Sequence, residues 1–364
     1  MIGLYSPDVP PVPGGVADHT LALAHALARA GSPPVVFARR GEAERFAPVA
    51  CTTGVATGDL AAAVARFGVR ALILQYTPFL YARRGVAPAV VRAARAVADA
   101  GVRLALFVHE PFVPFTRLPW LVTGLPQRWQ LRQLVRRAAW VYAGVPRFAE
   151  QAGRHARNGT VVRVVPVGAT LAVSPASRAE ARAALGLAAD DVAVGVFSPG
   201  ASGFLPTWIA AAAGRLASHP RVRWIRFGHG SDRPWDGWPA GGRTITLGEG
   251  PAEVVARTMR ALDLIAAPYV DGLTLRRTSA MLALATGIAT VSSTGSLFDP
   301  TAGALAACEP TADAFAARLA ALVDDAPGRA ALAARAGGYA AVASTERLAA
   351  VLLADLEPAA ERRP

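Results

Sequence analysis

Residues 262–291 read LDLIAAPYVDGLTLRRTSAMLALATGIATV. The stretch opens on an apolar run of strand length, Leu262–Ala266, and closes on a second one, Ile288–Val291. Between them a glycine-containing loop leads into Thr278–Ala285, an alanine- and leucine-rich segment that predicts a helix. A strand, a helix and a second strand in this order predict two parallel strands joined by a crossover helix, which is the repeating unit of α/β folds.

The same alternation extends over the rest of the chain, in two series separated by the Pro-, Ser- and Gly-rich segment Val165–Arg178. In the first series we predict strands at Ile2–Tyr5, Pro34–Ala38, Ala71–Gln75, Val102–Val108, Trp140–Tyr142 and Val161–Val165, with helices at Ala17–Arg29, Asp59–Phe67, Ala87–Ala100 and Arg128–Arg137. In the second series we predict strands at Val192–Phe197, Arg223–Phe227, Thr244–Thr246, Leu262–Ala266 and Ile288–Val291, with helices at Thr207–Ala217, Ala252–Ala261, Thr278–Ala285, Ala312–Leu322 and from Pro327 to about Leu356.

This organisation predicts an α/β fold with two doubly wound, Rossmann-like domains. The N-terminal domain is expected over residues 1–170 and the C-terminal domain over residues 171–345. A C-terminal helix and tail, residues 346–364, are expected to pack back toward the N-terminal domain. Doubly wound sheets bind ligands beyond the carboxyl ends of their strands, so functional side chains are expected just after the strands.

Composition excludes several kinds of chemistry. The 364 residues carry a formal net charge of +12, and every one of the 38 basic residues is arginine. The absence of lysine excludes a P-loop lysine and a Schiff-base lysine. Two cysteines, Cys51 and Cys308, cannot form a disulfide framework or a multi-cysteine zinc site, which favours a reducing, cytoplasmic location. The arginines are scattered and follow no nucleic-acid-binding pattern, so no nucleic-acid partner is expected.

The loop of the opening stretch carries the densest chemical signal. Asp271-Gly272-Leu273-Thr274-Leu275 is followed by Arg276 and Arg277 where the helix begins. Backbone amides at a helix start, together with two guanidinium groups, form a receptor for a diphosphate, and the neighbouring carboxylate of Asp271 is placed to hold sugar hydroxyls. The alternative is a capped helix with two solvated arginines.

Two further candidates follow strands of the first series. Gly14 and Gly15 open a helix after the first strand, with Asp18 in its first turn; they allow either close approach of an anion or an ordinary strand-to-helix turn. His109 and Glu110 directly follow the strand Val102–Val108. An imidazole there can donate to a sugar hydroxyl or a phosphate oxygen, or it can simply bond a loop carbonyl.

Aromatic and basic residues are interleaved after His109. Phe112, Phe115, Arg117 and Trp120 precede a segment with arginines at positions 128, 132, 136 and 137. One interpretation is contact with an anionic membrane that carries a lipid-linked acceptor, at the inner face of the membrane. The other is a core-packing helix with a solvated arginine face, beside an acceptor pocket lined by Phe112 and Trp120.

These motifs resemble those of the retaining GT-B glycosyltransferases of the large bacterial family 4, over nearly the whole chain. The resemblance rests on Pro13–Thr20, on Val165–Gly168 and on residues 246–287. It implies two Rossmann-like domains facing a central cleft. It also implies that Gly14, Gly15 and the loop Leu273–Leu275 approach the diphosphate of a nucleotide-sugar donor. Asp271 is then a ligand of the sugar, and His109 lies near the sugar.

The chain departs from the family pattern at two places. Ser279 stands where the family has a second carboxylate, and the loop Phe197–Phe204 lacks the family's basic pair. Arg276 and Arg277 are expected to supply the missing positive charge, as in the variant motif Asp-Gly-x-x-x-Arg-Arg.

The resemblance implies transfer of a sugar from a nucleoside-diphosphate sugar to a sugar, lipid-linked or small-molecule acceptor, with retention of configuration. Departure of the diphosphate needs charge stabilisation, which amides and arginines provide. With no Asp-x-Asp pair, no metal site and no cofactor are expected. A phosphate oxygen is thought to take the acceptor proton, so His109, Glu110 and Asp271 need not act as a strong base. Two alternatives remain open: a sugar-nucleotide epimerase using His229 and Glu249, and a catalytically silent sugar-nucleotide-binding or scaffold protein.

Overall fold

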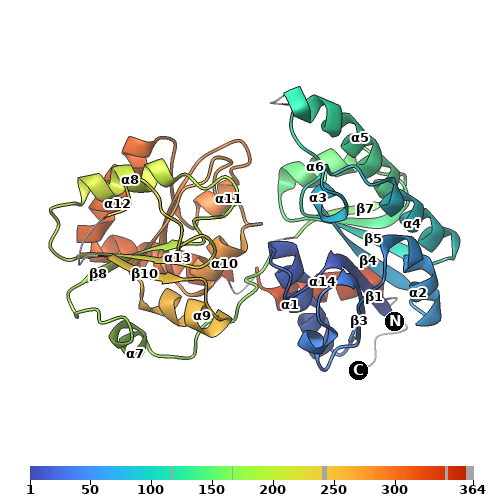
Figure 1. Cartoon of the computed structure of the whole chain (residues 1–364), viewed down its shortest axis with the longest axis horizontal. Helices are drawn as coiled ribbons and strands as arrows, with labels where there is room; N and C mark the ends of the chain where they lie inside the picture. The colour runs from blue at the N-terminus through green and yellow to red at the C-terminus, as the bar shows by residue number, and fades with distance from the viewer. Residues whose placement is uncertain (116–117, 166, 240–243, 341–342, 358–364) are drawn as a thin grey trace. The chain divides into compact units, whose positions relative to one another are not determined.

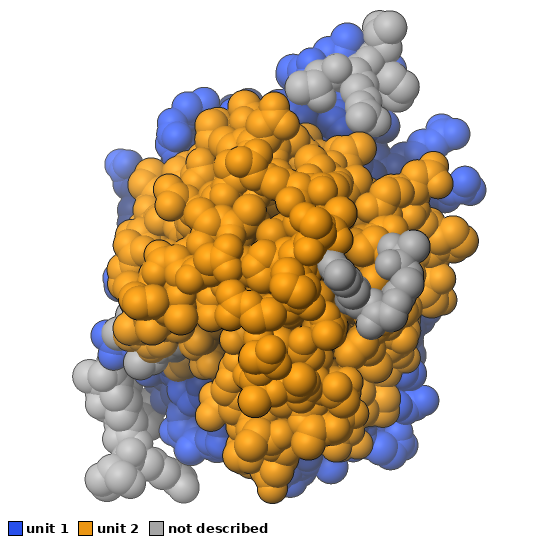
Figure 2. Space-filling model, turned by 90° about the vertical axis from the view of Figure 1, so that its left-hand side faces the viewer, with its two compact units in different colours: residues 1–167, 345–364 blue, residues 168–344 orange. Residues whose placement is uncertain are grey.

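The computed structural model describes residues 1–115, 118–165, 167–239, 244–340 and 343–357. The chain divides into two compact units (Figures 1 and 2). Unit 1 comprises residues 1–167 together with residues 345–364, and unit 2 comprises residues 168–344. The last helix of the chain therefore belongs to the same unit as the first strand.

Unit 1 is built on a parallel sheet with the strand order β3-β2-β1-β4-β5-β6-β7. Its described strands are β1 (Ile2–Asp8), β2 (Val35–Arg40), β3 (Cys51–Thr52), β4 (Ala71–Tyr76), β5 (Arg103–Val108), β6 (Ala138–Ala143) and β7 (Val161–Val164). Its described α-helices are α1 (Gly15–Arg29), α2 (Leu60–Arg66), α3 (Pro78–Tyr81), α4 (Pro88–Asp99), α5 (Leu118–Val135), α6 (Pro146–Gly153) and α14 (Thr345–Leu356), and short 3-10 turns lie at Ala43–Phe46 and Thr57–Asp59.

Unit 2 repeats the plan with the parallel order β10-β9-β8-β11-β12-β13. Its described strands are β8 (Val192–Phe197), β9 (Val222–Phe227), β10 (Thr244–Gly248), β11 (Leu264–Ala267), β12 (Ala289–Ser293) and β13 (Ala307–Glu309). Its described helices are α7 (Arg178–Ala183), α8 (Pro206–Arg215), α9 (Ala252–Ala261), α10 (Thr278–Ala285), α11 (Pro300–Gly303), α12 (Ala312–Asp324) and α13 (Ala326–Ala340).

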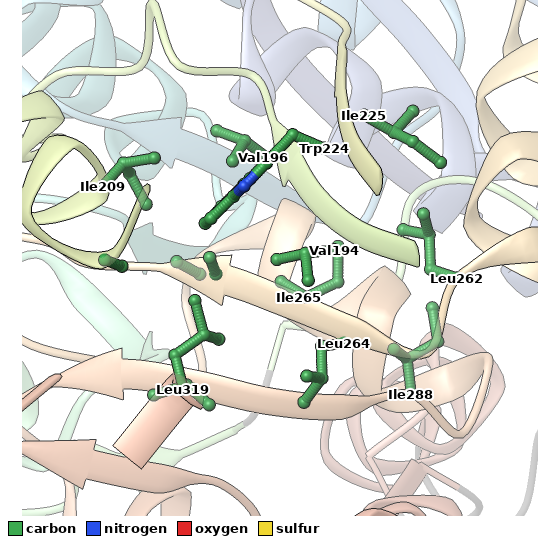
Figure 3. Close-up of a cluster of buried hydrophobic side chains, with 14 of the residues drawn as sticks. Val194, Val196, Ile209, Trp224, Ile225, Leu262, Leu264, Ile265, Ile288 and Leu319 are labelled. Atoms are coloured by element: carbon green, nitrogen blue, oxygen red, sulfur yellow. The ribbon is translucent and has the colours of Figure 1, made fainter. Parts of the chain in front are cut away.

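The strands of both units are apolar because helices cover both faces of each sheet. In unit 2, α8 and α12 lie on one side of the sheet and α9 on the other (Figure 1). Figure 3 shows Val194, Ile225 and Ile265 of three strands among residues of the helices, such as Ile209 and Leu319. These side chains are at most 2% exposed, so the rigid sheet holds the loops at its edge in place.

Several predicted boundaries differ from the structure by a few residues, and two predicted helices differ more strongly. The helix predicted at Arg128–Arg137 begins at Leu118, ten residues earlier, and the segment from Pro327 to Leu356 forms two helices, α13 and α14. The tail residues 358–364 and Arg117 lie outside the described residues.

Candidate functional site

The strand order of each sheet has one point where it reverses direction. In unit 1 this point lies between β1 and β4, and in unit 2 it lies between β8 and β11. At such a switch point the loops leave two neighbouring strands in opposite directions and open a crevice at the carboxyl edge of the sheet. The loop that contains Gly14 follows β1, and the loop that contains Asp271 follows β11. The fold thus places both loops at the switch points.

The glycine pair lies at the start of α1. Gly14 is the residue that precedes the helix, and no side chain caps the helix there. A Cβ added to Gly14 or Gly15 would meet no heavy atom within 4 Å, so the space over the helix start is open. Asp18 is exposed in the first turn, where its N–H donates to the Gly14 carbonyl. An uncapped helix start with open space above it suits an anion.

His109 lies at the end of β5 within a cluster of rings. Its ring stacks on Phe107 with 4.8 Å between centroids and meets the edge of His19 at 5.0 Å. His109 Nε2 lies 2.5 Å from Gln75 Oε1, a hydrogen bond that orients the imidazole. Glu110 follows it and accepts from Thr77 Oγ1 at 3.4 Å.

Two residues of this cluster were not singled out from the sequence. His19, on α1, is 1% exposed, and Gln75, the penultimate residue of β4, is fully buried. His19 Nε2 and Gln75 Nε2 have no hydrogen-bond partner among the described residues. Burial lowers the pKa of His19 to about 4, so this imidazole is neutral at physiological pH. The sequence does carry a signal for both residues, because Gln75 is a polar residue in an otherwise apolar strand and His19 is a polar residue on the apolar face of a helix.

The loops after β8 and β11 pair with one another in unit 2. Phe204 and Tyr269 form an antiparallel bridge, and Val270 N donates to the Gly203 carbonyl at 2.8 Å. Arg277 reaches across the pair, because its Nη1 donates to the Ser202 carbonyl at 3.3 Å. The loop that lacks charged residues of its own therefore receives a guanidinium group from the neighbouring loop.

Asp271 accepts hydrogen bonds from both arginines of its motif. Arg276 Nη2 donates to Asp271 Oδ2 at 2.7 Å, and Arg277 Nη2 donates to Asp271 Oδ1. The three side chains are largely buried, with 12–21% of each exposed. Arg277 also lies 3.8 Å from the centroid of the Tyr269 ring. Two guanidinium groups against one carboxylate leave one net positive charge at this edge of the sheet.

The rest of the motif is packed inward. Gly272 has φ +81°, and a Cβ there would lie 2.6 Å from the Gly295 nitrogen. Leu273 N donates to the Ser293 carbonyl at 2.9 Å, so its amide is already bonded within the loop. Thr274 and Leu275 are buried, and Thr274 Oγ1 has no partner among the described residues. Ser279 Oγ lies 3.2 Å from Tyr269 Oη.

A second polar pair follows β9 and β10. His229 Nδ1 lies 2.7 Å from Glu249 Oε1, and Gly230 N donates to the same oxygen at 3.2 Å. Both side chains are more than half exposed. The residues proposed as the alternative acid–base pair are therefore in contact with each other.

The aromatic segment after His109 packs on a helix arginine. The Arg128 guanidinium lies 3.9 Å from the centroid of Phe112 and 3.7 Å from that of Phe115. Trp120 is half-buried in the first turn of α5. Over the described residues, no group of three or more His, Cys, Asp or Glu side chains is arranged to hold a metal ion.

Comparison with known proteins gives the fold. No protein-family model matches the chain, and no curated protein sequence matches it. The structure is similar to sucrose-phosphate synthase from Thermosynechococcus elongatus, at 16% identity and a TM-score of 0.69, covering 98% of this chain and 97% of that one. It is similar to HepE of Anabaena, solved with UDP and glucose, at 18% identity and a TM-score of 0.65, covering 98% of both chains.

A third similar structure is that of a Listeria monocytogenes protein assigned as a UDP-N-acetylglucosamine 2-epimerase. It shares 10% identity and a TM-score of 0.63, covering 100% of this chain and 97% of that one. Likenesses at this level of identity establish architecture, not activity. With its two parallel-sheet units, the chain has the GT-B fold of two Rossmann-like domains.

Proposed function

We propose that the protein is a glycosyltransferase that moves a sugar from a UDP-sugar to an acceptor, with retention of configuration and without a metal ion. The observation that carries the proposal is the Asp271–Arg276–Arg277 cluster at the switch point of unit 2. Structures similar to this one were solved with UDP and with UDP-glucose, which supports uridine as the base.

The cluster suits a leaving diphosphate. Guanidinium groups bind phosphate oxygens in bidentate geometry, and in a partly buried site their charge is screened little by water. Asp271 holds both groups in place before the donor binds, so little reorganisation is needed as negative charge develops. In this proposal a donor phosphate oxygen takes the acceptor proton, while His109 and Asp271 contact the sugar.

Thermal unfolding with UDP or uridine tests the phosphate receptor, with and without magnesium. A ligand at a hundredfold excess over its Kd stabilises the fold by about 2.7 kcal/mol. We expect UDP to raise the Tm without magnesium and uridine to leave it almost unchanged. Arg277→Ala should abolish the UDP shift, whereas Arg318→Ala should retain it, because Arg318 is exposed on α12 and pairs with Glu309. Equal shifts by UDP and uridine would contradict the proposal.

The variant Asp271→Asn distinguishes binding of the sugar from binding of the diphosphate. The amide keeps the shape of the carboxylate but loses its charge and one acceptor. We expect the affinity for UDP to be no weaker, and the preference for UDP-sugar over UDP to fall about tenfold, the loss of roughly one charge-assisted hydrogen bond. If both affinities fall together, Asp271 organises the loop instead of binding the sugar.

The contact between His229 and Glu249 favours a second candidate, epimerisation of a UDP-sugar. A histidine beside a carboxylate can remove the proton from the sugar carbon next to the anomeric centre as the C–O bond to UDP breaks, and return a proton to the other face as that bond forms again. Incubation of UDP-sugars without acceptor, followed by proton NMR, would show the epimer; His229→Asn should then abolish its formation. UDP binding with neither epimer nor transfer product would indicate the catalytically silent alternative.

A further inference from the structure

The first half of helix α5 carries its polarity in the reverse of the usual order, whereas Leu131, Leu134 and Val135 in its second half are buried as usual. Gln127 and Gln130 are at most 1% exposed on its inner side. Leu121, Val122, Leu125 and Trp129 are 44%, 77%, 64% and 51% exposed on its outer side, with Phe115 exposed just before the helix. We call these five residues the α5 outer face. They account for five of the eleven large exposed hydrophobic side chains in the described residues.

Hydrogen bonds fix this orientation. Gln127 Oε1 accepts from Val113 N at 2.9 Å, and Gln130 Oε1 accepts from Ala87 N at 2.8 Å. Gln130 Nε2 also donates to Tyr76 Oη at 3.0 Å. Turning the helix to bury Leu121 and Leu125 would leave these buried amides without partners, which is costly. The hydrogen bonds of the two buried glutamines therefore fix the helix orientation that exposes this apolar side.

Arginines surround the α5 outer face and acidic residues are absent from its sequence. From residue 111 to residue 149 the chain has six arginines and no aspartate or glutamate. Arg132 is exposed and continues the stripe of Val122, Leu125 and Trp129 at helical spacing. Exposed Arg84 lies beside the helix, because its carbonyl accepts from Gln127 Nε2 at 3.3 Å.

Charge is also divided unequally between the two units. Unit 1 contains 23 arginines and 12 acidic residues, and unit 2 contains 15 arginines and 14 acidic residues. Nearly all of the net charge of +12 thus belongs to the unit that carries α5. Two copies of unit 1 would repel each other across this face, whereas an anionic surface would attract it.

We propose that the α5 outer face docks the protein onto anionic phospholipid bilayers. The apolar side chains enter the boundary between headgroups and acyl chains, and the flanking arginines bind lipid phosphates. In Figure 1, α5 lies at the periphery of unit 1, in keeping with the exposure of the α5 outer face. No helix in the described ranges is long and apolar enough to cross a membrane.

The docking surface also limits the chemical class of the acceptor, an inference that rests on the proposed function. A transferase held at the bilayer by its N-terminal unit meets acceptors that are anchored in the same bilayer. A lipid-linked acceptor is then the expected class. Vesicle binding is measured without donor or acceptor, so its outcome is independent of catalysis.

Sedimentation with lipid vesicles tests the docking. The full-length protein is mixed with phosphatidylcholine vesicles or with vesicles containing about one-third phosphatidylglycerol, at about 0.1 M and about 0.5 M NaCl. Val122→Glu places a charge in the α5 outer face. The matched control is Val164→Glu, which makes the same change at a 48% exposed valine on β7 of the same unit. Trp129→Phe keeps the apolar surface but removes a fluorophore that brominated lipids quench.

We expect the wild-type protein to bind anionic vesicles at least tenfold more strongly than neutral ones, and salt to weaken this binding. Val122→Glu should reduce binding about tenfold while Val164→Glu changes it less than twofold, and Trp129→Phe should lose most of the lipid quenching without losing binding. The proposal is overturned if the wild-type protein stays in solution, or if both glutamate variants bind equally. It is also overturned if Val122→Glu converts a dimer to a monomer in sedimentation velocity while vesicle binding is unchanged.

Discussion

His19 shows what a single buried group does at the candidate site. Its imidazole contacts both Phe107 and His109, which stack on each other at the carboxyl edge of the unit 1 sheet. Because the pKa of His19 is about 4, its imidazole is a neutral polar group in this ring cluster at physiological pH. Its Nε2 has no hydrogen-bond partner among the described residues, so a water molecule or ligand hydroxyl that reached it would satisfy it.

The stability of the protein should fall in acid because of His19. The folded pKa is about 4 and the ordinary value is 6.5, so the unfolded chain binds the proton first. The free energy of unfolding is therefore unaffected by His19 above pH 6.5. It falls as the pH drops from 6.5 toward 4, by about 3 kcal/mol in total. Urea unfolding at several pH values should show this slope in the wild type and a flatter one in His19→Gln. His25→Gln, on the same helix, should keep the slope.

Gly15→Ala probes the open space over the start of α1. A Cβ there meets nothing within 4 Å, so we expect unfolding free energy to change by less than about 1 kcal/mol. If a diphosphate approaches the amides closely, the methyl group should weaken UDP binding at least tenfold, measured by calorimetry. Gly58→Ala, also unobstructed, is the control. Unchanged UDP affinity in Gly15→Ala would mean that the glycine pair serves the turn alone.

Among the elements, the long buried strands were predictable and the exceptions have physical causes. β8, α9 and α10 have the predicted bounds, because apolar runs and helical composition agree with burial there. β3 and β13 are two and three residues long, too short to leave a pattern. The start of α5 was missed because its leucines face outward, so the expected inward period is absent. The break between α13 and α14 was not predicted, because the alanine-rich composition on both sides of it favours one continuous helix.

The site loops could be located from sequence, but their bonding could not. A strand followed by Asp271-Gly272 predicts a loop at the sheet edge whatever its partners are. That both arginines bind Asp271, and that Leu273 N bonds Ser293, depends on the neighbouring loop after β12. His19 and Gln75 were missed for the same reason, since their role depends on contacts between α1, β4 and β5.

Helix α14 should act as a structural part of unit 1. Leu348, Leu352 and Leu356 are at most 3% exposed in the same cluster as Leu23 and Leu27 of α1. Leu352→Ala should lower the unfolding free energy by roughly 2–5 kcal/mol, the range for buried leucine truncations. Val351→Ala, half-buried on the same helix, should cost less than about 1.5 kcal/mol. Hydrogen exchange should quicken in β1 and β4 of the leucine variant and stay slow in β8 and β11.

Across the whole molecule, the two units differ in how the chain completes them. Unit 2 is one continuous segment with cores formed from its own residues, whereas unit 1 needs both ends of the chain. Residues 168–344 expressed alone should therefore melt cooperatively, and residues 1–167 alone should not. Joining 1–167 to 345–364 through a flexible linker of roughly ten residues should restore a cooperative melt. Cooperative melting of 1–167 by itself would contradict this division of the core.

The return of the chain to unit 1 also sets an order of events during synthesis. A ribosome releases residues 1–167 first, but the three leucines that close their core emerge only after the whole of unit 2. Unit 2 can complete its packing while unit 1 still exposes the face of α1 that awaits α14. The N-terminal unit is thus completed after unit 2 although it is made first, and a premature stop before Leu348 leaves that face uncovered for chaperones and proteases to recognise.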